Sequence, residues 1–151
     1  MNSLRVLQRL ARPHHIGYSP LFPPAVLFLS IASTNQADLA AGGEPIRIGV
    51  QRQVGHRTAL QHGIGIVKEF IEIGAPATSL RRRPTLRRLI AYLKHHPDVR
   101  YVIFPGPQRF AKTRAHAELL RGHFQSLNVL VLLALPGSQH DRELLLPKDS
   151  L

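Results

Sequence analysis

The segment Ala25-Val-Leu-Phe-Leu-Ser-Ile-Ala-Ser-Thr-Asn-Gln36 decides the fold class of this chain. Its first part, residues 25–31, is an apolar run with the length of a β-strand. Such a run is typical of a parallel strand that is buried on both faces of its sheet. The segment therefore predicts a strand in the interior of a sheet.

Strand-like and helix-like segments alternate along the rest of the chain. Predicted strands cover 25–31, 64–71, 99–104 and 129–134, predicted helices cover 48–62, 85–95 and 113–127, and predicted loops cover 35–45 and 74–82. Gly63 follows the first helix as a C-cap, and Pro84 opens the second. On the first helix we place Val50, Val54 and Leu60 on one side. The alternation implies an α/β fold, a single three-layer domain with a mainly parallel sheet of about four or five strands.

Length and charge narrow the class of protein. The 151 residues allow one domain, and a hydrophobic content of 44% is ordinary for a globular protein. Twenty Lys and Arg residues against nine Asp and Glu give a net charge of +11. This charge favours polyanionic partners, nucleic acid before anionic membrane, and the alternative is a solvated basic surface without a partner. No segment reaches the roughly 20 apolar residues of a membrane span, so no membrane insertion is predicted.

Cysteine and histidine usage predicts neither a disulfide framework nor a metal site. The chain has no Cys, which fits a reducing compartment, and we predict a cytoplasmic protein without cofactors. The pairs His14-His15 and His95-His96 lack the i, i+4 spacing and the acidic partners of a zinc site.

Three regions are expected along the chain. Residues 1–24 form a basic N-terminal arm, which we expect to be flexible, and residues 25–135 form the domain. Residues 136–151 form a short C-terminal tail without a clear period.

The opening segment resembles the first strand of the serine recombinases, the resolvase/invertase family. In that family the strand of the N-terminal catalytic domain ends in a pattern close to Y-x-R-V-S-T-x-x-Q. Laid on this chain without gaps, Tyr falls on Phe28, the phosphate-binding Arg on Ser30, the nucleophilic Ser on Ala32 and the Gln on Gln36. The resemblance therefore implies an active-site strand that lacks its reactive atoms.

Further segments resemble the same family in the same order. Ile48-Gly-Val-Gln-Arg52 resembles I-P-A-Q-R and puts Gln51 on an active-site Gln, and Val67-Lys-Glu-Phe-Ile-Glu72 resembles V-x-E-F-x-D. Leu80-Arg-Arg-Arg-Pro-Thr-Leu86 resembles S-x-D-R-P-x-L and puts Arg83 on a phosphate-binding Arg. The chain is thus identified as a degenerate member of this family with a resolvase-like domain.

The segment Val102–Thr113 carries the last part of the resemblance. It is similar to V-V-V-x-K-x-D-R-L-A-R-D, and it keeps one catalytic Arg as Arg109. Gln108 replaces the Asp of that pattern, and Lys112 replaces its second Arg. An ammonium group does not reproduce the planar fork with which a guanidinium holds two phosphate oxygens.

These departures predict a recombination-related protein that does not cleave DNA, a pseudoenzyme of a mobile element. Ala32 has no nucleophilic atom, so the chain would act through weak, non-specific DNA binding or through another recombinase subunit. The family has a long helix and a separate DNA-binding region after this domain, and residues 136–151 are too few for them. The expected DNA-binding residues are Arg82, Arg83, Arg87, Arg88, Arg109 and Lys112.

Two alternatives stay open. In the first, the chain is an active recombinase or integrase component that uses Ser33 as its nucleophile. That alignment puts Ile31 at the Arg position, and a slip by one residue would turn the side chains of the strand to the opposite face. In the second, of lower weight, the chain is a basic α/β interaction domain that does not act on DNA.

Overall fold

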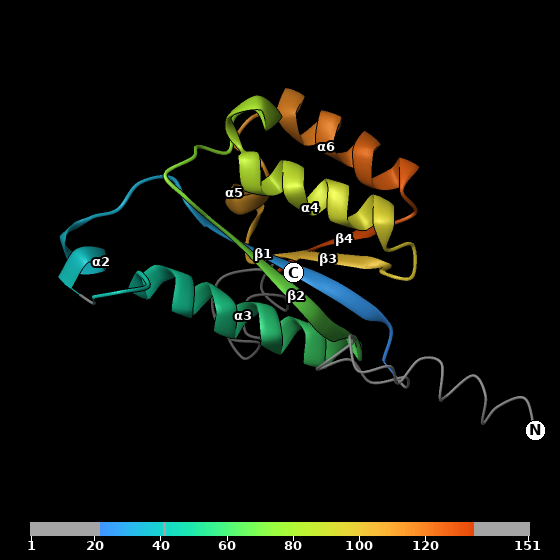
Figure 1. Ribbon diagram of the computed structural model, residues 1–151, viewed down its shortest axis with the longest axis horizontal. Coiled ribbons are helices and arrows are strands. Elements are labelled where there is room, and N and C mark those ends of the chain that lie inside the picture. Colours follow the sequence, from blue (N-terminus) through green and yellow to red (C-terminus); the bar gives the residue numbers. More distant parts are fainter. Residues whose placement is uncertain (1–21, 41, 135–151) are drawn as a thin grey trace, which may run out of the picture.

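The sheet of this protein has four strands, all parallel, in the order β2-β1-β3-β4. This computed structural model describes residues 22–40 and 42–134. The strands are β1 (Pro24–Ile31), β2 (Gly65–Ile73), β3 (Tyr101–Phe104) and β4 (Leu130–Leu133). Strand β1 lies between β2 and β3, and its residues are buried throughout (Figure 1). The predicted α/β fold with a buried parallel strand at 25–31 is confirmed.

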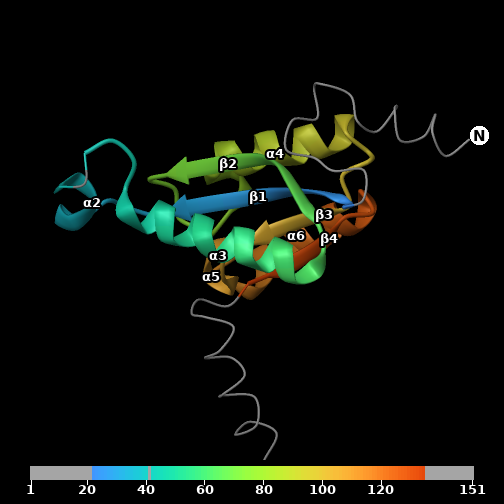
Figure 2. The ribbon, with the colours of Figure 1, turned by 90° about the horizontal axis from the view of Figure 1, so that it is seen from below.

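Helices cover both faces of the sheet and complete three layers (Figures 1 and 2). One face carries α3 (Ile46–His62), and the other carries α4 (Pro84–His95) and α6 (Arg114–Ser126). Short helices α2 (Gln36–Ala40) and α5 (Pro107–Phe110) and the 3-10 turn η2 (Leu80–Arg82) lie where loops or a break were predicted. Elements of about one turn are too short to show a period in the sequence, so the prediction missed them.

Aromatic rings close the face of the sheet under α4 and α6. Phe104 of β3 lies 5.4 Å from Phe28, 5.0 Å from Phe110 and 6.0 Å from Phe124 between ring centroids. Four apolar residues of α4 that follow the i, i+3, i+4, i+7 spacing of one helix face are all buried in this cluster: Leu86, Leu89, Ile90 and Leu93. This face therefore holds the larger part of the core.

Aliphatic side chains of the sheet close the face under α3, to which the helix itself contributes few large apolar residues. The buried residues of this helix are Ile48, Gln51, Gly55, Thr58 and Ala59. A Cβ atom on Gly55 would stand 2.4 Å from Leu27 Cδ1, so the backbone of α3 approaches β1 more closely than a larger residue permits. The side of α3 with Val50, Val54 and Leu60 does not face the core, because Val50 is 56% and Leu60 81% exposed and Val54 is half-buried. Small and polar buried residues leave no apolar period from which the inner side could be recognised.

The ends of the elements agree with their capping residues. Gly63 ends α3 with a left-handed φ of 64°, and Pro84 is the first residue of α4, as predicted. Pro24 already belongs to β1, whereas the residues of the arm before Phe22 and the tail 136–151 lie outside the described residues. In the described part of the chain, no helix is long and apolar enough to cross a membrane.

Candidate functional site

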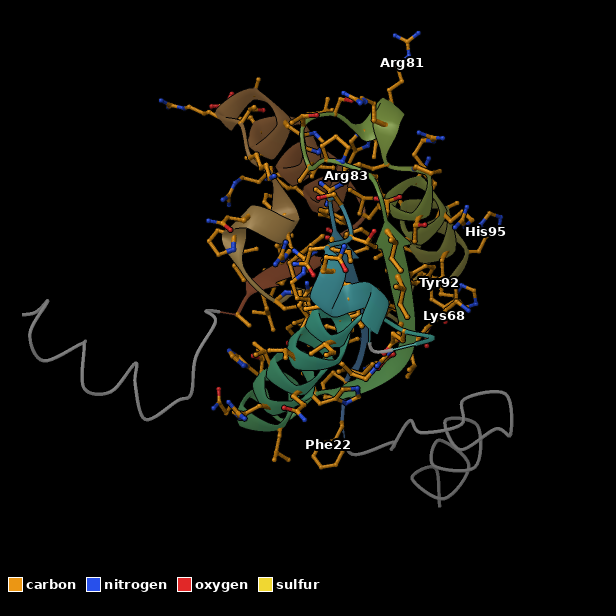
Figure 3. The ribbon with its side chains drawn as sticks, turned by 90° about the vertical axis from the view of Figure 1, so that its left-hand side faces the viewer. Phe22, Lys68, Arg81, Arg83, Tyr92 and His95 are labelled. Carbon is orange, nitrogen blue, oxygen red and sulfur yellow. The ribbon has the colours of Figure 1, made fainter. Side chains whose placement is uncertain are left out.

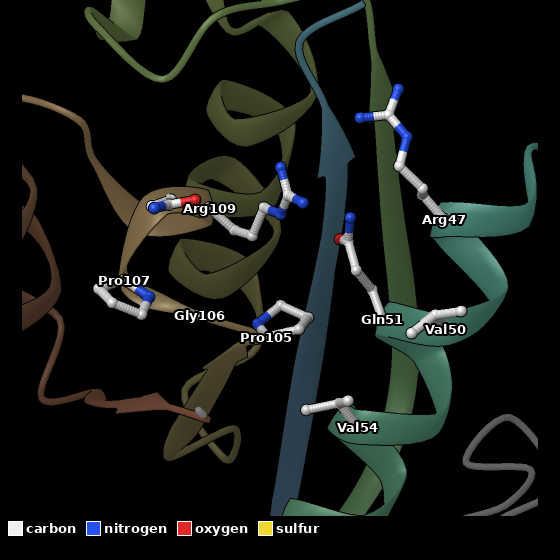
Figure 4. A pocket seen from close by; sticks show the side chains of 9 residues that line it. Arg47, Val50, Gln51, Val54, Pro105, Gly106, Pro107 and Arg109 are labelled. Carbon is white, nitrogen blue, oxygen red and sulfur yellow. The ribbon is translucent and has the colours of Figure 1, made fainter. Parts of the chain in front are cut away.

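A cavity of about 360 Å³ opens at the carboxyl ends of the strands, between α3 and the segment that follows β3 (Figure 4). Its lining residues are Arg47, Val50, Gln51 and Val54 of α3 and residues 105–109 around the start of α5. The carboxyl ends of parallel strands are where open α/β sheets bind their ligands. The cavity is therefore the first candidate for a functional site.

Two arginines face each other across this cavity (Figure 4). Burial and, second to it, the charge of Arg47 lower the pKa of Arg109. The Arg109 side chain makes no hydrogen bond or ion pair with any residue that the structure describes. Arg47 is neutralised by Asp38, with 2.6 Å between Arg47 Nη2 and Asp38 Oδ2. One uncompensated positive charge thus remains in the cavity, and an anion would neutralise it.

The loop after β1 holds Arg47 in place. Asp38 Oδ2 accepts a hydrogen bond from the Asn35 backbone nitrogen at 2.8 Å, and Asn35 Oδ1 accepts one from the Asp38 nitrogen at 2.9 Å. This reciprocal pattern at the start of α2 is a capping box. The hydrogen bond from Arg47 is the main reason why the pKa of the Asp38 carboxyl is lowered. Arg47 Nη2 also donates to the Ser33 carbonyl, which ties the loop to α3.

Gln51 forms the link between α3 and β1 at the floor of the cavity. Its Oε1 accepts a hydrogen bond from the Ser30 nitrogen at 2.9 Å, and its Nε2 donates to the Ser30 carbonyl at 2.7 Å. The pairing of β1 with β3 stops at Leu27, so the amide of Gln51 takes the place of a neighbouring strand. Gln51 is therefore engaged with the backbone, and Ser30 is buried beneath it.

Arg83 lies inside the protein (Figure 3) and contacts the backbone of α5. The residue is 1% exposed, and its guanidinium donates to the carbonyls of Phe110 and Arg109 at 2.5 Å each. It also lies over the Phe28 ring, 5.2 Å from the centroid. Arg83 was expected to contact DNA, and in this structure protein carbonyls accept hydrogen bonds from the donors that a phosphate would need. Arg83 instead holds the short helix that carries Arg109.

A buried carboxylate and a histidine surround the Arg83 guanidinium. Glu72 Oε1 lies 3.6 Å from Arg83 Nε, and Glu72 Oε2 accepts a hydrogen bond from the Thr85 nitrogen. His116 Nε2 lies 3.0 Å from Arg83 Nη1. Burial lowers the pKa of Arg83 to about 10 against the opposing effect of Glu72. Burial and the Arg83 charge also lower the pKa of His116, so the neutral imidazole is favoured.

The resolvase N-terminal domain model matches residues 36–143 of this chain, which is more than half of its length. The chain belongs to the resolvase N-terminal domain family. Its match begins at Gln36, after β1 has ended. The chain is therefore a serine-recombinase-like domain, related to proteins of site-specific recombination.

Solved structures of serine recombinases share the fold. The C-terminal catalytic domain of ISC1926 TnpA, an IS607-like serine recombinase, is 18% identical over 83% of this chain and 79% of that one, with a TM-score of 0.60. The N-terminal catalytic domain of TP901-1 integrase is 19% identical over 72% and 75%, with a TM-score of 0.55. A serine recombinase from Sulfolobus solfataricus is 14% identical over 82% and 75%, with a TM-score of 0.50. No curated protein matches the chain significantly in sequence.

In this resolvase-family domain, the end of β1 lies at the same edge of the sheet as the cavity. Strand β1 ends at Ile31, Ala32 is half-buried and Ser33 is exposed. Neither Ala32 nor Ser33 is therefore part of the strand. The alternation of strand side chains, which weighed against Ser33 in the sequence, does not govern its direction. The Ser33 carbonyl contacts Arg47, which lines the cavity.

Only some of the site residues that the family resemblance implied line the cavity. Gln51, Gln108 and Arg109 line it, whereas Arg83 is buried and Lys112 is exposed outside the lining. The expected DNA-binding residues Arg82, Arg87 and Arg88 are exposed on η2 and α4.

No site role was assigned from the sequence to the other lining residues, which include Arg47, Val50 and Val54 of α3. Arg47 stands four residues before Gln51 on the same helix, and this i, i+4 spacing could have placed it at the site. The two valines were only grouped with Leu60 on one side of the helix, so no signal assigned them to a cavity.

Proposed function

We propose that this resolvase-family domain binds the phosphate backbone of DNA in the cavity between α3 and α5, without cleaving it. The observation that carries the proposal is Arg109, an unpartnered guanidinium beside Arg47 in the described part of the chain. A guanidinium offers two parallel donors to phosphate oxygens, and binding there would relieve the repulsion between the two arginines.

The absence of cleavage rests on the atoms at the end of β1. Cleavage by this family requires a serine oxygen that attacks phosphorus, so that protein becomes joined to the DNA end. Ala32 stands at that position by resemblance and has no such oxygen. Ser30 is buried with its backbone bound to Gln51, so it does not replace the missing Arg. Binding without chemistry is the function that these residues support.

Exposed arginines on η2 and α4 supply a second, diffuse contribution to DNA binding. Residues 73–97 contain no Asp or Glu, and Arg82, Arg87 and Arg88 are exposed there. Arg87 Nη1 donates to the carbonyls of Leu80 and Arg81, which leaves its charge unneutralised. Phosphate contacts of this kind release counterions, so binding should be weak, non-specific and strongly dependent on salt.

The test compares two arginine variants that remove the same charge. Duplex binding is measured by fluorescence anisotropy across a salt series for Arg109→Gln and for Arg57→Gln, an exposed position on α3 outside the cavity lining. We expect Arg109→Gln to weaken binding by about tenfold and Arg57→Gln much less, because only Arg109 would lose a bidentate contact. Equal losses would mean that the charge acts diffusely and that the cavity is no site.

A second candidate function, cleavage by Ser33, is favoured by one contact. The Ser33 carbonyl accepts a hydrogen bond from Arg47, which brings the backbone of Ser33 to the cavity. A covalent protein–DNA adduct on supercoiled DNA distinguishes the two candidates. We expect no adduct with the unmodified chain, alone or mixed with an intact recombinase subunit. An adduct that disappears with Ser33→Ala would establish Ser33 as the nucleophile and overturn the proposal.

A further inference from the structure

The cavity has an apolar wall as well as two arginines. Val54 and Pro105 lie on the side away from the Arg47 and Arg109 guanidinium groups, with Gln51 between (Figure 4). Val50 is also among the lining residues. A free phosphate ion would need the arginines only. The lining therefore suits a ligand that has an anionic end and an apolar body.

The packing of α3 on the sheet leaves both valines at least partly exposed. The helix buries Gln51 and Gly55 against β1, and this leaves Val50 56% exposed. A single exposed apolar residue is ordinary on a protein surface. Here two valines and Pro105 line one cavity beside an unneutralised arginine, so charge and apolar surface are available to the same ligand.

Arg47 retains a donor for such a ligand. Asp38 and Ser33 accept hydrogen bonds from its Nε and Nη2 atoms. Its Nη1 atom has no partner among residues 22–40 and 42–134. The guanidinium of Arg109 has all its donors free among the described residues. Together with Arg47 Nη1, these donors suit one phosphate group held between the two side chains.

We infer that the cavity binds one unstacked nucleotide of single-stranded DNA. Its phosphate lies between Arg47 and Arg109, and its sugar and base pack on Val50, Val54 and Pro105. The inference rests on the proposed function and adds the class of DNA to it. A volume of about 360 Å³ is near the lower end of ligand cavities, which suits one nucleotide and not a helical segment. In a duplex the base stays paired and stacked, and extracting it costs free energy.

The test measures the affinity of the full chain for three labelled 20-mers by fluorescence anisotropy. The probes are oligothymidylate, a duplex, and a strand of abasic sites that keeps the phosphates without bases. We expect oligothymidylate to bind about tenfold more tightly than the duplex and the abasic strand. Oligothymidylate binding no tighter than either one would overturn the inference, and so would equal competition by free thymidine monophosphate at the same nucleotide concentration.

Variants separate this inference from the proposed function. Val50→Thr combined with Val54→Thr keeps the shape and charge of the wall but makes it polar, and Leu60→Thr is the control at an exposed site of α3 outside the lining. The double variant should lose about fivefold in oligothymidylate affinity and nothing in duplex affinity. An unchanged oligothymidylate affinity would overturn the inference. If Arg109→Gln still weakened all three probes, the proposed phosphate site would stand without it.

Discussion

The face of the sheet under α4 and α6 is closed by large aromatic side chains, whereas the face under α3 is closed by aliphatic ones and ends in an open cavity. On the first face, Phe104 packs against Phe28 and Phe124, and the buried Arg83 lies over the Phe28 ring. On the second, Gly55 lets α3 lie close to β1, and the end of the helix borders the cavity. One face thus contributes the larger part of the core, and the other leaves room for a ligand.

The two faces also use arginine in opposite ways. Arg83 directs its donors to carbonyls of α5, and it is 1% exposed beside the carboxylate of Glu72. Arg109 is itself a residue of α5, and its guanidinium has no partner among the described residues. The same side chain therefore stabilises the fold where it is enclosed by acceptors, and it is available to a ligand where it is not.

Removing each guanidinium in turn should give the largest difference in stability between the two faces. Arg83→Met should lower the free energy of unfolding by about 3–5 kcal/mol, because it leaves the Glu72 carboxylate buried without its partner. Arg109→Met should change it by less than about 0.5 kcal/mol, because no described residue loses a partner. Urea unfolding followed by circular dichroism measures both. Similar losses from the two variants would show that the faces do not differ in this way.

Two glycines on α3 test how closely the helix packs on β1. Gly55→Ala should destabilise the protein by about 1–3 kcal/mol, because the new Cβ atom would overlap Leu27. Gly49→Ala is the matched control on the same helix. Nothing lies within 4 Å of a Cβ atom there, and the variant should stabilise by about 0.5–1 kcal/mol through helix propensity. Thermal unfolding compares them, and a stabilising Gly55→Ala would refute the close approach.

The smallest effect is expected from the buried imidazole beside Arg83. The pKa of His116 is lowered in the folded state, so the unfolded chain binds a proton at a higher pH than the folded protein does. The free energy of unfolding should therefore show no loss from His116 above a pH of about 6.5. Below that pH it should fall as the pH drops, by at most about 1.4 kcal/mol per pH unit. His116→Gln should flatten this slope in urea unfolding between pH 7.5 and 5.5.

The control for this slope is His95→Gln, which changes an exposed histidine at the end of α4. It should leave the pH dependence as it is in the unmodified protein. A slope that is equally flat in both variants, or unchanged in His116→Gln, would show that Arg83 and burial do not keep His116 neutral.

Much of the fold could be predicted because the relevant signals are local. The apolar run at 25–31, the i, i+3, i+4, i+7 pattern on α4 and the capping Gly63 each act over a few residues. The family resemblance also led to Gln51 and Arg109, which line the cavity. Short helices α2 and α5 were missed because a single turn shows no period, and tertiary contacts such as those of Asp38 and Arg83 hold them.

The sequence by itself determined the parallel α/β order, the basic charge and the alanine where the family resemblance expects a serine. Only the tertiary structure decided which arginine is enclosed and which is open to a ligand. Arg83 and Arg109 are the same residue type, and nothing in the residues beside them shows which of the two the fold will enclose. The difference arises because Glu72 and the carbonyls of α5 converge on Arg83 from distant parts of the chain. Desolvation and hydrogen bonding depend on that convergence, so they exist only once the chain has folded.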